Sequence, residues 1–224
     1  MNPIDRFLSL LAPQVCIGCN GEGAVLCQEC QDSITPSPSI CFACGKATRN
    51  FRPCPDCISR NKPGHTWIFT EYANKPKDLI RALKFDQRRQ GAKEIALLMD
   101  ESFPYFASEP VVTFVPTSSG RRRERGFDQA ELIAKELAKI RGWHYQRCLT
   151  RQKNTRQLGA NRQERLKQLK GVFRPSGQTL TGRSILLVDD VCTTGATLEA
   201  CTKELKKAGV AQIDAVVFAR TPKK

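Results

Sequence analysis

The 224-residue chain is predicted to fold as an α/β protein with a parallel sheet, preceded by a small cysteine-rich module. From Thr66 onward, short apolar runs rich in β-branched residues alternate with segments of helical spacing, which is the pattern of a parallel sheet with crossover helices. The first 62 residues instead carry eight cysteines and few large apolar residues. Hydrophobic residues make up 40% of the chain, enough for a substantial core, and no apolar run reaches the ~18 residues of a membrane span.

The amino-terminal cysteines form four C-x-x-C pairs, separated by 7, 10 and 9 residues. Each pair suits the tight turn that presents two thiolates to one tetrahedral Zn²⁺, so two structural zinc ions are predicted. Disulfides or redox dithiols are the alternative, but the chain begins without the basic region of a secretory signal, which favours metal in the cytoplasm. Sequential pairing is expected, although the spacing leaves a crossed or nested arrangement open. The predicted ligands are Cys16, Cys19, Cys27 and Cys30 for one zinc and Cys41, Cys44, Cys54 and Cys57 for the other.

Residues 1–62 are therefore predicted to be a double zinc ribbon and residues 63–224 a second domain, joined by a linker at 60–65. A Pro/Ser-rich stretch at 31–40 connects the two ribbons and is expected to let them stack or swing. Metal must supply most of the folding free energy of so small a module. Its nearly balanced charge favours a structural or docking role over direct DNA contact.

The net charge of +14 is unevenly distributed. Residues 120–175 contain 16 Lys or Arg and 5 acidic residues, a local balance of +11. Such a segment attracts polyanions, either a pyrophosphorylated sugar or a nucleic-acid backbone, and charge alone does not choose between them.

The second domain is predicted to alternate strands and helices. Lys84, on the first helix, could reach a substrate, but a solvated side chain is the favoured interpretation. Strands are expected at 66–72 with alternating burial, 111–115, 143–150, 184–188 and 211–220, and helices at 77–85, 90–99, 127–140 and 197–208.

The stretch SILLVDDVCTTGAT, residues 184–197, carries the most specific chemistry. An apolar strand ends at Val188, Asp189 and Asp190 follow, and a Thr/Gly turn leads into a helix. Ligands of open α/β sheets bind beyond the carboxyl ends of the strands. The N–H groups of such a turn and the helix dipole favour a phosphate, whereas the carboxylates suit sugar hydroxyls or Mg²⁺. An ordinary strand, turn and helix with solvated aspartates is the alternative.

This stretch resembles the phosphoribosyl pyrophosphate (PRPP) motif of type I phosphoribosyltransferases. The segment VVTFVPTSSG, 111–120, is similar to the pyrophosphate loop of the same enzymes. RRxRGFxQA, 122–130, resembles the R-x-RGFNQA signature of the ComF family of DNA uptake and competence, with Asp128 in place of Asn. Gln157, Arg165 and Phe173 match the loop that closes over PRPP in that family, and Gln168 replaces its usual Asn.

The resemblance implies a type I phosphoribosyltransferase fold with a small amino-terminal double zinc-ribbon domain. It implies a Mg²⁺-dependent transfer of phosphoribosyl from PRPP to an unknown nitrogen acceptor, in a cytoplasmic protein linked to DNA uptake. The alternative is a non-catalytic PRPP sensor or single-stranded-DNA-binding competence protein, and competence-machinery proteins are further candidate partners. The implied catalytic residues are Asp189 and Asp190, and the implied substrate-binding residues are Thr193, Thr194, Gly195, Ala196, Thr197, Thr117, Ser118, Ser119, Arg123, Arg125 and Gln157.

Overall fold

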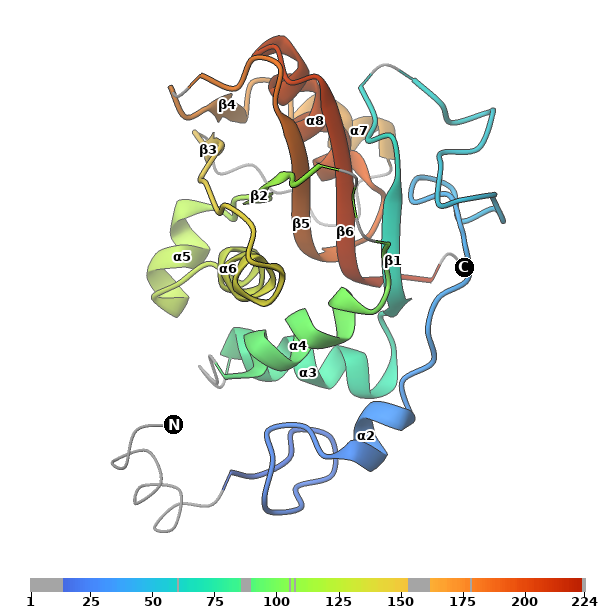
Figure 1. The fold of residues 1–224 in the computed structure, drawn as a ribbon, viewed down its shortest axis with the longest axis vertical. Coiled ribbons are helices and arrows are strands. Elements are labelled where there is room, and N and C mark those ends of the chain that lie inside the picture. Colours follow the sequence, from blue (N-terminus) through green and yellow to red (C-terminus); the bar gives the residue numbers. More distant parts are fainter. Residues whose placement is uncertain are drawn as a thin grey trace.

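The computed structural model describes residues 14–59, 61–85, 90–104, 106, 108–152, 162–177 and 179–222. At its centre is a four-stranded parallel sheet, with the strands in the order β1-β6-β5-β2 (Figure 1). These strands are β1 (Thr66–Glu71), β2 (Val111–Phe114), β5 (Ser184–Cys192) and β6 (Gln212–Arg220). The predicted parallel α/β sheet is thereby confirmed. No helix in the described part of the chain is long and apolar enough to cross a membrane.

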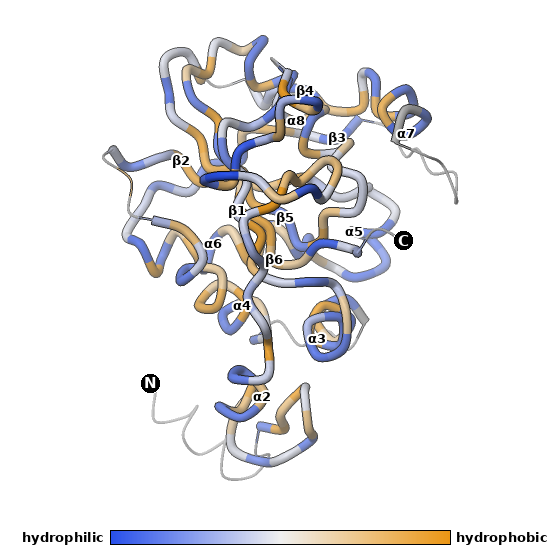
Figure 2. Tube along the Cα trace, turned by 90° about the vertical axis from the view of Figure 1, so that its right-hand side faces the viewer, coloured by the Kyte–Doolittle hydropathy of each residue, from blue (hydrophilic) through white to orange (hydrophobic). Residues whose placement is uncertain are grey.

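The sheet is buried on both faces, because its strands alternate their side chains between two hydrophobic clusters. On β5, Leu186 and Val188 face one cluster, and Ile185 and Leu187 face the other. Orange, hydrophobic segments accordingly gather at the strands in the centre of the molecule (Figure 2). The prediction of alternating burial for the first strand was wrong, since five of the six residues of β1 are buried.

Helices cover each face. On one face, which we call the α3 face, lie α3 (Asn74–Phe85), α4 (Gly91–Asp100) and α6 (Gln129–Arg141). On the opposite face, the α8 face, lie α8 (Ala196–Lys207) and a small antiparallel pair formed by β3 (Leu149–Arg151) and β4 (Phe173–Pro175). The remaining helices are α2 (Gln28–Asp32), α5 (Ser119–Arg125) and α7 (Arg162–Gln168).

Three predicted boundaries differ from the structure. The strand expected at 184–188 continues to Cys192, because Asp189, Val191 and Cys192 still pair with β6. The strand expected at 143–150 is reduced to β3, and Tyr145 makes only an isolated bridge to Val112. The arginine-rich segment at 119–125, for which no helix was predicted, forms the short helix α5.

The two ribbons pack on opposite faces of the sheet instead of forming a hinged pair. Cys16, Leu26 and Cys30 of the first ribbon belong to the cluster of the α3 face. Cys41 and Phe42 of the second belong to the cluster of the α8 face. In Figure 1 the first ribbon lies next to α3 and α4, and the chain then passes beside β1.

The segments expected to be mobile connectors are bonded to the sheet. In the stretch between the ribbons, Ser37 N–H donates to the carbonyl of Phe69 at 2.6 Å, and the Thr70 hydroxyl donates to Thr35 at 2.8 Å. In the expected linker, His65 contacts the Asp214 carboxylate through both its backbone N–H, at 2.8 Å, and its ring Nδ1, at 2.9 Å. The expectation that the ribbons stack or swing is not met, because groups of β1 and β6 fix the connectors and the ribbons lie on opposite faces of the sheet.

Candidate active site

The loops after β2 and β5 open at the same edge of the sheet. The two strands are parallel neighbours, with Phe114 opposite Val188. Beyond this pair, Val115 N–H donates to the Val188 carbonyl at 2.9 Å. The segment 117–119 therefore lies beside the end of β5, which carries the acidic pair and leads into the 193–197 turn, at the carboxyl ends of the strands, where α/β sheets bind ligands.

The acidic pair lies within the last part of β5, so its two side chains point to opposite faces of the sheet. Asp190 turns toward the α3 face, where its Oδ2 lies 2.5 Å from Lys84 Nζ. Burial opposes ionisation of Asp190, but the ammonium of Lys84 outweighs it and lowers the pKa of that carboxyl. Burial, reinforced by the negative charge of Asp190, raises the pKa of Asp189 well above its usual value. The pair therefore holds its negative charge mainly on Asp190, with Lys84 as counter-ion.

The turn from β5 into α8 has the form expected of a phosphate cradle. Gly195 is the N-cap of α8 and adopts a left-handed conformation with φ of +74°. The Thr194 hydroxyl accepts the Ala196 N–H at 3.4 Å, and the first turn of α8 then begins at Ala196. Exposed Thr193 accepts a 2.5 Å hydrogen bond from Arg165 of α7, which reaches across to this loop. Thr197 is half-buried in the first turn of α8.

The loop after β2 is held by a buried carboxylate. Asp128 Oδ2 accepts the backbone N–H of Thr117 at 2.7 Å, and the Asp128 side chain is almost wholly buried. Burial, together with the charge of Asp190, raises the pKa of Asp128 to about 6, against the opposing effect of the Thr117 N–H. Ser118 caps α5 by accepting the N–H of Arg121 at 3.4 Å, and Ser119, the first residue of α5, is exposed.

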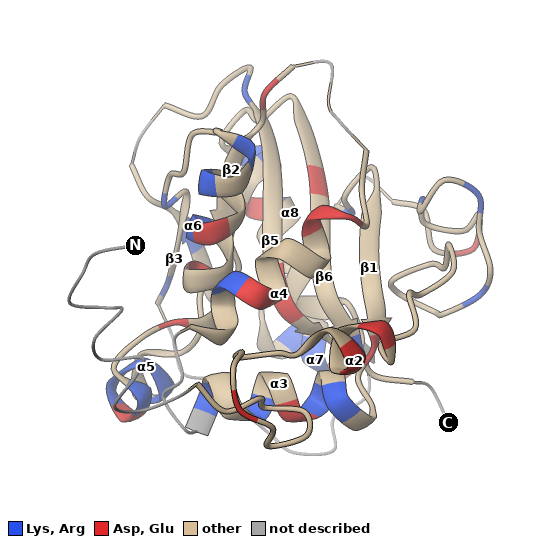
Figure 3. Cartoon of the chain, turned by 60° about the horizontal axis from the view of Figure 1, so that its bottom comes forward, with Lys and Arg blue, Asp and Glu red and all other residues tan. Residues whose placement is uncertain are grey.

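The arginines of α5 are divided between the surface and the helix that follows. Arg122 and Arg123 are exposed, and Figure 3 shows α5 as a largely blue, basic helix. Arg125 is half-buried and donates to Gln129 of α6 at 3.0 Å. Of the substrate-binding residues predicted from the sequence, Gln157 lies outside the described residues, and the others come from the two loops and from α5.

Lys84 and Asp128 were missed as site residues by the sequence interpretation. Lys84 follows buried Leu83 and lies four residues after buried Ile80, so the helical period places it beside the apolar face. That spacing could have shown that the side chain points toward the sheet instead of into solvent. For Asp128 the sequence offers its place at the start of α6 and its position in the signature-like segment 122–130, but the contact with Thr117 is tertiary.

The eight paired cysteines form two compact clusters with the predicted sequential pairing. Within each cluster, all four sulfur atoms lie within 4.8 Å of one another. In the first, the N–H groups of Gly18 and Cys27 both donate to Cys16 Sγ at 3.3 Å. Burial would raise the pKa of Cys16, but these backbone donors lower it to about 6, which favours the thiolate that zinc requires. The residues therefore fit two four-sulfur zinc sites, in agreement with the prediction.

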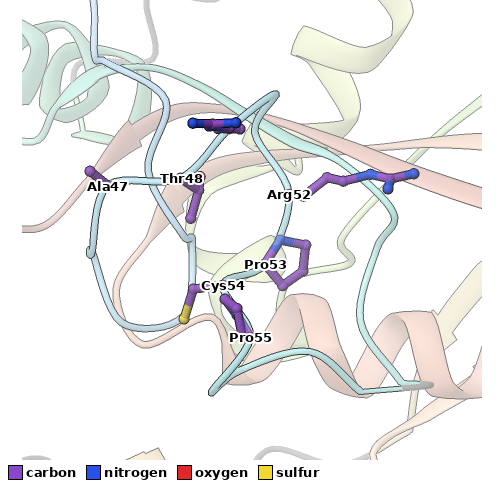
Figure 4. A pocket seen from close by; sticks show the side chains of 7 residues that line it. Ala47, Thr48, Arg52, Pro53, Cys54 and Pro55 are labelled. Atoms are coloured by element: carbon purple, nitrogen blue, oxygen red, sulfur yellow. The ribbon is translucent and has the colours of Figure 1, made fainter.

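The second ribbon also carries an open pocket, shown in Figure 4. It is separate from the candidate active site, because none of its lining residues belongs to the loops after β2 and β5. The pocket is lined by Ala47, Thr48, Arg49, Arg52, Pro53, Cys54 and Pro55.

Comparison with known proteins agrees with this geometry. Residues 126–224 match the family model of the phosphoribosyl transferase domain. Over 197 residues the chain is 30% identical to the competence protein ComFC of Streptococcus pneumoniae, an alignment that covers 86% of each chain. It is 28% identical to the DNA utilization protein YhgH of Escherichia coli K12, over 88% of this chain and 90% of that protein. Among solved structures, the glutamine PRPP amidotransferase of B. subtilis is 16% identical, with a TM-score of 0.41, over 58% of this chain and 26% of that chain.

The fold and the matched segment define a protein with a phosphoribosyl transferase domain. Within this class, the identity and the coverage of nearly the whole chain show that it belongs to the ComF family.

Proposed function

We propose that the protein binds PRPP with Mg²⁺ and transfers its phosphoribosyl group to a nitrogen acceptor in a cytoplasmic process linked to DNA uptake. The observation that carries this proposal is the shared edge of β2 and β5, where an acidic pair, a Thr/Gly turn into a helix and a hydroxyl-rich loop converge. The name of the S. pneumoniae relative, a competence protein, supports the link to DNA uptake.

In this proposal each chemical group of PRPP has a matching part of the chain. Asp189 and Asp190 accept hydrogen bonds from the ribose hydroxyls. The N–H groups at the start of α8, with the hydroxyls of the 193–197 turn, bind the 5′-phosphate. Segment 117–119 and the arginines of α5 bind the pyrophosphate. The segment 152–165, of which 153–161 lie outside the described residues, is the part of the chain to which we assign closure over the substrate and exclusion of water that would hydrolyse the reaction centre.

The displacement breaks the bond between C1 of the ribose and the pyrophosphate oxygen, and the acceptor nitrogen forms the new bond to C1. The ionised carboxylate of Asp190, with the carboxyl oxygens of Asp189 beside it, stabilises the positive charge that develops on the sugar ring. The oxygen donors of this pair suit Mg²⁺, which when bound would neutralise the leaving pyrophosphate. Arg123 and Arg125 take part in the same neutralisation from α5.

Calorimetric titration of the zinc-loaded protein with PRPP and Mg²⁺ tests the binding. We expect saturable binding that Asp190→Asn weakens, because the variant loses the charged acceptor of the pair. Asp78→Asn, an exposed site on α3, is the matched control and should bind as the unaltered protein does. A folded, zinc-loaded protein that shows no heat of PRPP binding would overturn the proposal.

Turnover is tested separately by PRPP-dependent release of pyrophosphate across a panel of nucleobases and small amines. Release with one acceptor class identifies the second substrate. PRPP binding without release under any acceptor would instead indicate a sensor that keeps the site without catalysis.

The exposed arginines of α5 favour a second candidate function, which is the binding of single-stranded DNA. Here we expect retardation of an oligonucleotide at low salt, lost steeply as salt rises and reduced in Arg122→Ala with Arg123→Ala. Glu124→Gln, on the same exposed helix, is the control and should not weaken the complex. Absence of retardation at low salt would count against this function.

A further inference from the structure

Phe42 of the second ribbon lies directly against the turn that leads from β5 into α8. Its side chain is 1% exposed, and it follows Cys41, the first cysteine of the second cluster. A Cβ atom built on Gly195 would lie 2.6 Å from Phe42 Cδ2 and 2.7 Å from Cε2. The ring therefore occupies the space that any other residue at position 195 would need. Since Gly195 also has a φ of +74°, two independent constraints require glycine there.

The backbone of Phe42 is tied to the two strands that flank this turn. Its carbonyl accepts a hydrogen bond from Arg220 Nε at 3.3 Å and a weaker one from Cys192 Sγ at 3.7 Å. Cys192 is the last residue of β5 and Arg220 the last of β6. The Thr221 N–H then donates to the Cys192 carbonyl at 3.0 Å. The ring of Phe42 thus contacts the turn at Gly195, and its carbonyl contacts the ends of β5 and β6.

The turn that carries Phe42 is itself held by the cysteine cluster. Cys41 N–H donates to the Lys46 carbonyl at 2.8 Å, and Gly45 N–H donates back to the Cys41 carbonyl at 2.8 Å. Cys41 and Cys54 are both buried, and the sulfur cluster to which they belong joins the turn that carries Phe42 to the segment around Cys54. Four-sulfur clusters of this kind become rigid when metal binds, because their small cores do not hold the turn otherwise.

We propose that Phe42 is a positioning residue for the 193–197 turn, and that the second ribbon acts as a support for the phosphate-binding end of the site. The ring stacks beneath Gly195 and sets the direction in which the first N–H groups of α8 point. This inference rests on the proposed function only in assigning a phosphate to the turn. The physical contact between the ribbon and the turn is independent of the ligand.

Hydrogen exchange of the unliganded, zinc-loaded protein tests the contact without any substrate. We expect Phe42→Ala to speed exchange in the 193–197 peptide by about ten-fold, because the turn loses a buried aromatic contact. Phe42→Leu keeps part of the apolar surface and should restore much of the protection. Leu26→Ala is the matched control, since Leu26 is 2% exposed, adjoins a ligand cysteine of the first ribbon and packs on the opposite face of the sheet.

The inference is overturned if a Phe42→Ala variant that loads two zincs leaves exchange at 193–197 no faster than Leu26→Ala does. If the alanine variant does not load two zincs, Phe42→Leu takes its place: its exchange at 193–197 should still exceed that of the unaltered protein, and exchange equal to that of the unaltered protein would overturn the inference. Metal analysis and thermal unfolding of each variant show whether the ribbon itself has been lost. If the unaltered protein binds no PRPP, the proposed function fails while the exchange result still decides the role of Phe42.

PRPP titration adds a coupling test where binding is observed. Gly195→Ala should weaken PRPP binding strongly but measurably, and the part of this loss that comes from the clash with the ring should vanish when Phe42→Ala removes the ring. We therefore expect the double variant to bind better than the product of the two single losses predicts, by about five-fold or more. Additive losses would contradict direct contact as the source of the effect.

Discussion

The two ribbons have the same cysteine pattern, yet they support opposite faces of one sheet. The first packs against α3, where Lys75 Nζ donates to Cys30 Sγ at 3.0 Å. The second packs on the α8 face, where Phe42 reaches the turn at Gly195. One ribbon therefore contacts a helix that carries the counter-ion of the acidic pair, and the other contacts the turn beside that pair. The comparison shows that a repeated metal motif can hold two different parts of a single site.

The faces also differ in the kind of interaction that they bring to the site. The α3 face supplies charges, with Lys84 against Asp190 and Asp128 against the Thr117 N–H. The α8 face supplies a close steric contact, in which the ring of Phe42 packs against Gly195. Variants on the α3 face should therefore respond to pH, whereas those on the α8 face should not.

The largest difference is expected between the two cysteine clusters. Cys41→Ser with Cys44→Ser should weaken PRPP binding by at least about 100-fold, because the support of the 193–197 turn depends on metal-induced folding of the second ribbon. Cys16→Ser with Cys19→Ser should lower the thermal midpoint while leaving most of the affinity. Metal analysis should give one zinc per chain for each double variant. Equal losses of PRPP affinity in the two double variants would contradict the assignment of the second ribbon alone to the 193–197 turn.

Lys84→Met tests the charge on the α3 face. Removal of the counter-ion leaves Asp190 buried without compensation, so the free energy of unfolding at pH 7.5 should fall by about 2 kcal/mol. Because Lys84 depresses the pKa of Asp190 in the folded protein, its stabilisation is present at neutral pH and is lost on acidification. The deficit of the variant, measured by denaturant unfolding, should therefore disappear only below pH ~4, as the pH falls through the lowered pKa of Asp190.

Lys77→Met is the control for this change, because Lys77 is an exposed residue of the same helix. It should unfold like the unaltered protein at every pH. A Lys84 deficit that is constant across pH would indicate lost packing instead of a lost ion pair.

Asp128→Asn should change the free energy of unfolding less than Lys84→Met does, and should raise it instead of lowering it. The raised pKa of about 6 means that the protonated carboxyl stabilises the fold fully below pH ~4, and that this contribution is lost as pH rises through 6. Asparagine keeps an acceptor for Thr117 and carries no charge, so the variant should be more stable by about 1–2 kcal/mol at pH 8 and equal at pH 4. Thermal midpoints at the two pH values measure this, and a gain that is largest at pH 4 would contradict the assignment.

The smallest effect is expected for Arg165→Met. Its guanidinium contacts Thr193 of the 193–197 turn, to which we assign the 5′-phosphate, and loss of one such hydrogen bond should weaken PRPP binding by about three- to ten-fold. Lys167→Met on the same helix is the control. Titration at two salt concentrations should show a shallower salt dependence for Arg165→Met alone.

Local pattern predicted the parts of the fold that depend on neighbouring residues. The apolar run before Asp189 predicted a strand, since a strand buried on both faces needs apolar residues throughout. The Thr/Gly turn before α8 predicted the start of a helix, since glycine readily adopts the left-handed conformation found there. Strand ends were less accurate, because pairing of β5 with β6 carries the strand through the acidic residues. The role of Lys84 was misjudged for a similar reason, since a lysine at the edge of an apolar helix face is compatible with both solvent and an ion pair.

The sequence by itself determined the α/β class, the four C-x-x-C pairs and the two loops that meet at the candidate site, and it favoured sequential pairing of the cysteines without deciding it. Each depends on spacing or on the chemistry of residues close together in the chain. Only the tertiary structure decided that the ribbons lie on opposite faces of the sheet, that Lys84 and Asp128 belong to the site, and that Phe42 fills the space beneath Gly195. Those contacts join residues far apart in sequence, and the packing of the sheet faces brings them together.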